Sequence, residues 1–208
     1  MTVQSREAAH ALRDRVIQAP RQGARRVIAI AGAPASGKST LADILVRELV
    51  DAGCSSQLVP MDGFHLHNSI LADRGLLDRK GSPQTFDTGG LLRLASQLGT
   101  AKALYYPIFD RGRDISIAGA GYIDPTCDTI VIEGNYLLMK APIWQDMATY
   151  WDMSVMLICP MDVLETRLVQ RWHDCGLTTA QARTRAEFND LPNARLVQQT
   201  ATIADIVI

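Results

Sequence analysis

One stretch constrains this chain more than any other, the segment RVIAIAGAPASGKSTL at residues 26–41. It fills the spacing G-x-x-x-x-G-K-[ST] with Gly32, Gly37, Lys38 and Ser39. Glycines allow a tight turn in which successive backbone N–H groups face one concavity, and the next helix adds its free N-terminal donors. The apolar run before the loop predicts a buried strand, and apolar residues at helical spacing after it predict a helix. The segment therefore predicts a phosphate-binding loop.

This loop predicts a nucleoside triphosphate as its ligand, and we expect ATP together with Mg²⁺. The Lys38 ammonium can reach the β- and γ-phosphates, and the Ser39 hydroxyl can bind Mg²⁺. The loop residues expected to hold the nucleotide are Gly32, Ala33, Pro34, Ala35, Ser36, Gly37, Lys38, Ser39 and Thr40.

Length and composition narrow the class of protein. The chain has 208 residues, enough for one domain (1–208) with a sizeable core. A net charge of -1 gives no reason to expect nucleic acid or an anionic membrane surface as partner. No apolar run approaches the roughly 20 residues of a membrane-spanning helix, and the N-terminus does not resemble a signal peptide. The four scattered cysteines favour reduced thiols in a cytoplasmic protein over a disulfide framework or a zinc site.

The order of expected elements predicts the fold class. Short apolar segments alternate with amphipathic ones, which is typical of an α/β fold of the P-loop NTPase type: three layers, with a parallel sheet of about five strands and helices on both faces. We expect helices at 6–19, 38–50, 69–77, 88–98, 161–172, 178–185 and 193–200, strands at 27–31, 57–61, 129–132, 154–158 and 203–208, and an irregular excursion or hairpin at 104–117.

Two acidic residues follow expected strands. Ligands of such sheets sit at the carboxyl ends of the strands, so Asp62 and Glu133 should converge with the phosphate-binding loop. Asp62 is a candidate base for the hydroxyl that receives a phosphoryl group, although a turn or helix-capping role is equally open. Glu133 is a candidate Mg²⁺ ligand, directly or through water, with a solvated strand-end charge as the alternative. Asp128, at the other end of the same strand, is expected to be structural.

Basic and aromatic residues supply further candidates. Arg167 and Arg171 are four apart on one expected helix, where guanidinium groups could contact the phosphates or the base, or form a solvated face. Arg111 and Arg113 form a second basic pair, suited to an acceptor that carries a carboxylate or a phosphate. His65 is expected to bond substrate or to pack.

Taken together, these residues identify a known family. The segments that carry the likeness are GAPASGKST (32–40), MDGFHLHN (61–68), KGSPQTFD (80–87) and IVIEGNYLL (130–138), with a looser match in YPIFDR (106–111). The chain resembles the P-loop kinases grouped with uridine kinase, phosphoribulokinase and bacterial pantothenate kinase. With FNDLPNARLV at 188–197, it is most similar to bacterial proteins labelled fructose transport system kinase or fructokinase.

The resemblance implies a role for each matched residue. It implies that Asp62, Lys38 and Glu133 are catalytic, that Ser39 and Glu133 serve Mg²⁺, and that Arg167 and Arg171 are arginines of a small lid at about 167–187. The residues expected near the acceptor are Asp62, His65, Asp87, Tyr106, Phe109, Arg111, Arg113 and Asn135. The RGR-type lid of uridine kinases is absent, since residues 167–173 read RLVQRWH, which argues against uridine as acceptor. The chain also ends at the last expected strand, so the adenine contacts that the family supplies beyond it should come from elsewhere.

We therefore expect an ATP- and Mg²⁺-dependent kinase acting on a hydroxyl of a small metabolite. A sugar such as fructose is the first acceptor to test, with pantothenate or a nucleoside second. A non-enzymatic nucleotide switch or ATPase is the alternative from another class, and a homodimer is left open.

Overall fold

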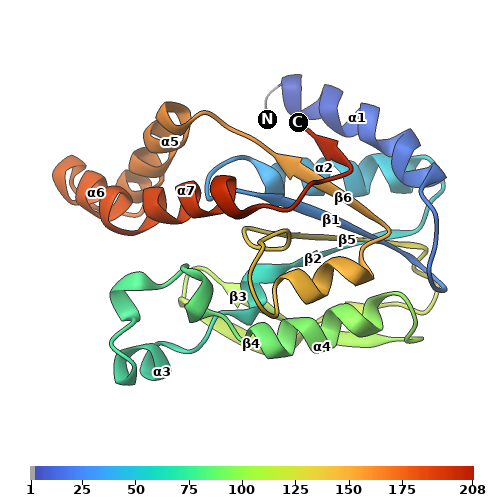
Figure 1. Ribbon diagram of the computed structural model, residues 1–208, viewed down its shortest axis with the longest axis horizontal. Coiled ribbons are helices and arrows are strands. Elements are labelled where there is room, and N and C mark those ends of the chain that lie inside the picture. Colours follow the sequence, from blue (N-terminus) through green and yellow to red (C-terminus); the bar gives the residue numbers. More distant parts are fainter. Residues whose placement is uncertain (1–2) are drawn as a thin grey trace.

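A five-stranded parallel sheet forms the centre of the molecule (Figure 1). The computed structural model describes residues 3–208, with side chains from Arg6 onward. In spatial order the strands are β2 (Ser56–Pro60), β5 (Thr129–Gly134), β1 (Arg26–Gly32), β6 (Met153–Leu157) and β7 (Ile206–Val207). Each neighbouring pair is parallel. The expected α/β fold with a sheet of about five parallel strands is confirmed.

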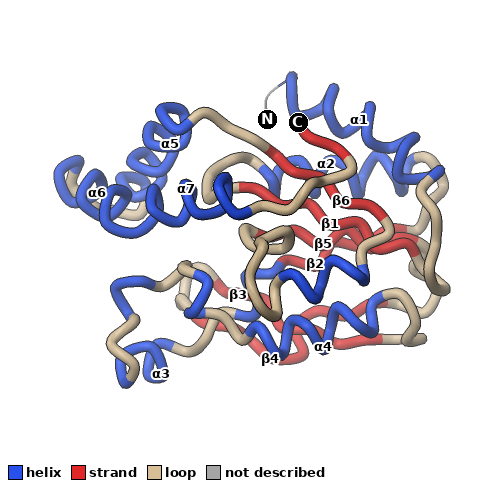
Figure 2. Tube along the Cα trace, in the orientation of Figure 1, coloured by secondary structure: helices blue, strands red, loops and turns tan. Residues whose placement is uncertain are grey.

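Helices cover both faces of this sheet, as expected for three layers (Figures 1 and 2). One face carries α1 (Val3–Gln18) and α2 (Lys38–Asp51). The other carries α4 (Thr88–Leu98), a 3₁₀ helix (Gln145–Tyr150) and the antiparallel hairpin β3 (Leu104–Asp110)–β4 (Ile115–Ile123). Side chains of a strand alternate between faces. Accordingly Ile28 and Ile30 pack toward α2, whereas Val27 and Ala29 pack toward α4.

A third group of helices lies beside the phosphate-binding end of the sheet. It consists of α5 (Met161–Asp174), α6 (Thr179–Arg185), a π-helical turn (Ala186–Asp190) and α7 (Leu191–Thr200). Leu164 and Leu168 of α5 pack with Leu191 and with Ala33 of the loop after β1. This cluster attaches the C-terminal helices to the phosphate-binding loop.

Several boundaries differ from those expected. The helix expected at 69–77 is α3 (Asn68–Asp73), which stops before Gly75 because that residue has φ +65°. The strand expected at 203–208 is reduced to β7, and Ile203 is fully exposed. The excursion at 104–117 is a hairpin that continues to Ile123. Within the described part of the chain, no helix is long and apolar enough to cross a membrane.

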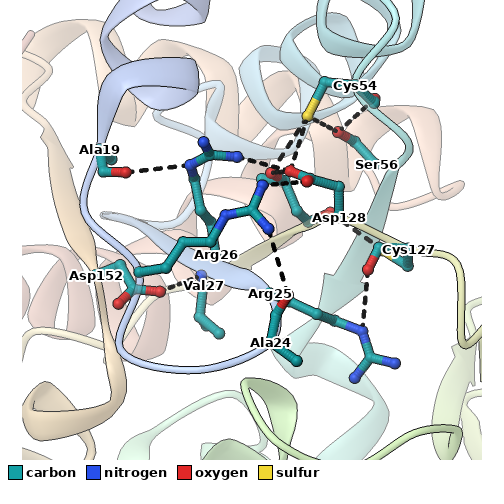
Figure 3. A network of polar contacts seen from close by, with 12 residues as sticks. Ala19, Ala24, Arg25, Arg26, Val27, Cys54, Ser56, Cys127, Asp128 and Asp152 are labelled. Atoms are coloured by element: carbon teal, nitrogen blue, oxygen red, sulfur yellow. Dashed lines mark hydrogen bonds and ion pairs between the residues drawn. The ribbon is translucent and has the colours of Figure 1, made fainter.

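Asp128 anchors a polar network at the amino end of β5, away from the phosphate-binding loop (Figure 3). Its carboxylate accepts a bond from Arg26 Nη1 at 2.7 Å, forms an ion pair with Arg21, and accepts a bond from the Cys54 thiol at 3.2 Å. The expected structural role of Asp128 is confirmed, because these bonds join the loop after α1 to β1 and to the start of β5.

Candidate functional site

The phosphate-binding loop spans the gap between β1 and α2. Gly37, at the N-cap of α2, has φ +100° with open space where a side chain would be, so the backbone conformation is what requires glycine there. Ala35 also adopts a positive φ of 60°. The turn places Lys38 and Ser39 as the first residues of α2, where backbone N–H groups are free to bind an anion.

The ends of three neighbouring strands bring the acidic residues to this loop. Glu133 of β5 is in register with Ile30 of β1 on one side and Pro60 of β2 on the other. Asp62 follows β2 directly, in a 3₁₀ turn (Met61–Phe64). At Gly63 a Cβ atom would lie 1.9 Å from the Pro107 carbonyl oxygen, so only glycine lets the hairpin pack this closely over the turn.

A cavity of about 790 Å³ opens between these elements. One wall is the phosphate-binding loop, the second is the Asp62 turn with the hairpin, and the third is formed by α5, α6 and the π-helical turn. The sequence-predicted residues that line it are Pro34, Ala35, Gly37, Lys38, Ser39, Thr40, Asp62, His65, Phe109, Arg111, Asn135 and Arg171. Of the two acidic residues expected at this edge of the sheet, Asp62 lines the cavity and Glu133 does not. The other expected nucleotide-binding residues that do not line it are Gly32, Ala33, Ser36 and Arg167.

The Asp62 carboxylate is held by a cation rather than by a helix N-terminus. Its Oδ2 accepts a hydrogen bond from Arg111 Nη2 at 2.5 Å. Burial would raise the pKa of Asp62, but the charges of His65, Arg111 and Lys38 outweigh it, and the pKa is lowered. Burial in turn lowers the pKa of His65, so Arg111 and Lys38 are the charges that act on Asp62 at neutral pH. Asp62 is consequently ionised and can accept a proton.

Glu133 is buried, with 4% of its surface exposed, which excludes a solvated strand-end charge. Burial raises the pKa of Glu133, against the opposing effects of the Lys38 charge and the Ser39 hydroxyl. Its Oε2 atom has no hydrogen-bond partner among the described residues. A buried carboxylate oxygen without a partner, beside a serine hydroxyl, is a donor set that suits Mg²⁺, which prefers oxygen ligands. The residues present therefore fit the metal.

Three of the residues expected near the acceptor do not line this cavity. Tyr106 is buried, and its hydroxyl donates to the Leu58 carbonyl at 2.9 Å. Asp87 caps α4 by accepting a bond from the Gly90 N–H. The Arg113 guanidinium donates to the carboxylate of the neighbouring Asp110 at 2.7 Å. Local capping and packing account for these side chains as they stand.

A second cavity, of about 600 Å³, lies on the other side of the phosphate-binding loop. Its walls are largely apolar, with Leu157, Ile158, Val163 and Ile208 among the lining residues. Arg167 faces this cavity and donates to the carbonyl oxygens of Ala35 and Ser36, both at 3.2 Å. The two arginines expected to act together are therefore divided between two cavities, because α5 crosses the loop between them.

Sequence reasoning missed several residues of the larger cavity. Arg185, Trp172 and Asp190 line it. Lys80 lines it too, with its ammonium bonded to Asn68 Oδ1 at 2.7 Å and to Asp114. Lys80 stands in the segment KGSPQTFD, so its basic charge in a loop was a usable signal. Nothing in the local sequence indicates that residues 172 and 190 meet.

No family model matches the chain. A protein of Schizosaccharomyces pombe (strain 972) named putative uridine kinase C227.14 is 32% identical, over 95% of this chain and 88% of that protein. A pantothenate kinase from Chelativorans sp. (strain BNC1) is 30% identical, over 70% of this chain and 49% of that protein. The crystal structure of a putative fructose transport system kinase from Silicibacter sp. TM1040 is 48% identical with a TM-score of 0.92, covering 96% of this chain and 98% of that one.

The three-layer sheet and its phosphate-binding loop thus define a P-loop enzyme. The chain belongs to the family of P-loop kinases that includes uridine kinases and pantothenate kinases, and it is a small-molecule kinase. Kinases of this family use ATP, typically with Mg²⁺.

Proposed function

We propose that this kinase transfers the γ-phosphoryl group of ATP to a hydroxyl of a small, uncharged, polyhydroxylated acceptor, a sugar such as fructose. The observation that carries the proposal is the charge balance of the larger cavity at its Asp62 end. There, Lys80 and Arg111 are each paired with a carboxylate, Asp114 and Asp62 respectively.

The nucleotide would bind across the loop between the two cavities. Lys38 and the loop amides would hold its phosphates, as helix N-termini and glycine-rich loops do. The apolar second cavity suits the adenine base, and Arg167 stands at its entrance. In this arrangement the base is held by the end of β6, the start of α5 and Ile208, together with Ala8 of α1. We propose residues 167–187 as the lid over the phosphates.

Ser39 and Glu133 would hold Mg²⁺. When bound, the metal supplies positive charge to the phosphate oxygens and helps to orient them. The unpartnered Glu133 Oε2 supports this assignment, because burying that charge costs free energy that a cation would offset. Lys38 then shares the charge of the same phosphates.

Asp62 would position the acceptor hydroxyl and take up its proton. Its lowered pKa keeps it ionised at neutral pH, and it lines the cavity with Lys38. Arg111 must share Asp62 with the acceptor, since the ion pair between them occupies one carboxylate oxygen. Positioning and charge neutralisation supply most of the rate in phosphoryl transfer, so this geometry matters more than the strength of the base.

The acceptor end of the cavity is electrically balanced. The Lys80 ammonium is almost enclosed and is matched by Asp114 at 2.9 Å, while Arg111 is matched by Asp62. The His65 and Phe109 rings lie 4.7 Å apart at this end, with the Lys80 ammonium 4.9 Å from the centroid of the Phe109 ring. Mixed charged and amide groups beside aromatic rings can bond hydroxyl groups and cover the C–H face of a sugar. An anionic acceptor would favour a pocket with net positive charge. These two ion pairs leave no net charge.

An acceptor with a carboxylate, such as pantothenate, is the second candidate. The observation in its favour is that the Arg111 side chain is 60% exposed and could exchange Asp62 for a ligand carboxylate. A nucleoside is a third possibility by family membership alone.

The test is an ADP-release screen with purified protein, Mg²⁺ and ATP over sugars, pantothenate and nucleosides. We expect a sugar, with fructose tested first, to accelerate ADP formation. Stimulation by pantothenate alone would replace the sugar by the second candidate. Steady ADP formation indifferent to every alcohol would instead favour a nucleotide switch or ATPase.

A further inference from the structure

Two arginines share one tryptophan ring on the third wall of the larger cavity. The guanidinium carbon of Arg171 lies 5.8 Å from the centroid of the Trp172 ring, and that of Arg185 lies 5.2 Å from it. All three side chains line the cavity together with Lys38 and Ser39. Two like charges repel at this separation, and the electron-rich face of an indole ring is the strongest aromatic partner for such cations.

The Trp172 ring is itself held by a partly buried hydrogen bond. Its Nε1–H donates to Asp190 Oδ2 at 2.5 Å. Asp190 belongs to the π-helical turn at 186–190, a rare conformation that occurs most often at functional sites. Ala186 and Asn189 of the same turn are fully buried, so the turn is packed into one position. The hydrogen bond and the packed turn together give the ring a defined orientation.

Most donors of the two guanidinium groups remain available. Arg185 Nη1 donates to the Asp78 carbonyl at 2.6 Å, which uses one of its five N–H groups. Among the described residues, no carboxylate lies within 4.0 Å of Arg171 or Arg185, in contrast to Arg111 and Lys80. The charges of both guanidinium groups act on the Asp190 carboxylate, but neither group forms a close ion pair with it, so their free N–H donors are suited to phosphate oxygens.

We propose that Trp172 and Asp190 are positioning residues, which hold the Arg171 and Arg185 guanidinium groups against the terminal phosphate of the nucleotide at the phosphate-binding loop. The proposal rests on the proposed function, because it needs ATP bound at that loop. Lys38, Asp62 and the two arginines line one cavity, so a phosphoryl group passing from the loop toward Asp62 would stay within the cavity that the arginines line. Arg185 also touches the Asp78 loop beside the acceptor end.

The consequence is selectivity for a triphosphate over a diphosphate. ADP lacks the terminal phosphate, so the affinity of the protein for ADP should not change when Trp172 or Asp190 is replaced. Arg167 should not contribute to this selectivity, because it donates to carbonyl oxygens of the phosphate-binding loop and lines the second cavity.

The experiment measures the dissociation constants of ADP and of the non-hydrolysable analogue AMP-PNP by calorimetry, both with Mg²⁺. The variants are Trp172→Leu, which removes the ring, Trp172→Phe, which keeps a ring but loses the N–H, and Asp190→Ala. Arg195→Gln is the matched control, because it removes an exposed cation of α7, outside the proposed lid, that lines neither cavity.

We expect Trp172→Leu to weaken AMP-PNP by about 5- to 30-fold, the range of a partly desolvated cation–π contact, with ADP unchanged. Trp172→Phe and Asp190→Ala should weaken AMP-PNP by about 2- to 5-fold. Arg195→Gln should leave both constants as in the wild type. The single-turnover rate should fall in the same order as AMP-PNP affinity.

Equal weakening of ADP and AMP-PNP in folded Trp172 variants would overturn the proposal, because a merely structural role moves both. An unchanged ratio of the two constants in Trp172→Phe and Asp190→Ala would overturn it as well, and these milder variants cover the case in which the leucine variant misfolds. If the folded wild type bound neither nucleotide, the proposed function itself would fail, an outcome distinct from a loss confined to AMP-PNP.

Discussion

The substitution Glu133→Gln should stabilise the protein while it abolishes catalysis. Glu133 is buried and one of its oxygen atoms has no partner, so the ionised carboxylate is unfavourable in the metal-free fold. An unsatisfied buried polar group costs about 1–3 kcal/mol, and more when it is charged. We therefore expect the free energy of unfolding to rise by about 1–3 kcal/mol in EDTA at pH 7. For a chain of this size, that is an increase of roughly 2–4 °C in melting temperature per kcal/mol.

The pH dependence follows from the direction of the pKa shift. The folded-state pKa of Glu133 is raised above its ordinary value of 4.5, so the contribution of this residue to the free energy of unfolding is fully present below pH 4.5. This contribution is lost as the pH rises through the folded-state pKa. Wild type and Glu133→Gln should therefore have similar free energies of unfolding near pH 4. As the pH rises to 8, the free energy of unfolding of the variant should become the larger of the two.

Asp128→Asn is the matched control, at the opposite end of the same strand. Burial acts to raise the pKa of Asp128, but hydrogen bonds from Thr129, Cys54 and Arg21 prevail and lower it. Its contribution is present above the ordinary value of 3.8 and is lost as the pH falls. Since Asp128 is partly exposed, we expect its variant to lose only about 1–2 kcal/mol at pH 7 and to keep full activity.

The assay is denaturant unfolding of the three proteins in EDTA, repeated with Mg²⁺ and AMP-PNP. Ligand should stabilise the wild type more than Glu133→Gln, because the variant has lost a metal ligand. A glutamine variant that is less stable than the wild type in EDTA at pH 7 would refute the reasoning, since Glu133 would then be satisfied within the fold.

Three further substitutions test single contacts of the site. Lys38→Ala should slow phosphoryl transfer by about 10²-fold or more without lowering the melting temperature, because Lys38 lies in a loop junction and its loss opens no core cavity; initial rates and melting curves check this. Ser39→Ala should raise the Mg²⁺ concentration for half-maximal rate more than it changes metal-free nucleotide affinity, and coincident Mg²⁺ titrations of the two proteins would argue against a metal ligand. Arg111→Gln removes a charge that lowers the pKa of Asp62, so the acidic limb of the rate–pH profile should move to higher pH; a limb that stays in place would separate Arg111 from Asp62 function.

The sequence predicted those parts of the site that depend on local chemistry and strand order. The phosphate-binding loop has a local signature, and parallel strands necessarily carry their next residues to one edge, so Asp62 and Glu133 could be placed beside Lys38. The buried strands and the helix at 88–98 were also readable, because apolar periodicity marks them.

The remainder depends on tertiary packing that no short segment encodes. Arg111 reaches Asp62 only because the hairpin packs over Gly63, and Trp172 reaches Asp190 only through a π-helical turn. Helix patterns could not indicate that turn, since one extra residue per turn leaves no distinct periodicity. The expected strand at 203–208 was mostly loop, because apolar composition alone does not tell an edge strand from an apolar segment packed at a surface.

The most direct test of the central claim is single-turnover transfer of labelled γ-phosphate to the acceptor found in the screen, by wild type and by Asp62→Asn. Asparagine keeps the shape and one accepting oxygen of Asp62 but cannot take a proton. We expect the label on the acceptor hydroxyl with the wild type, and a chemical step about 10²–10⁴-fold slower in the variant with AMP-PNP binding intact. A near-wild-type rate of transfer in Asp62→Asn would contradict the account.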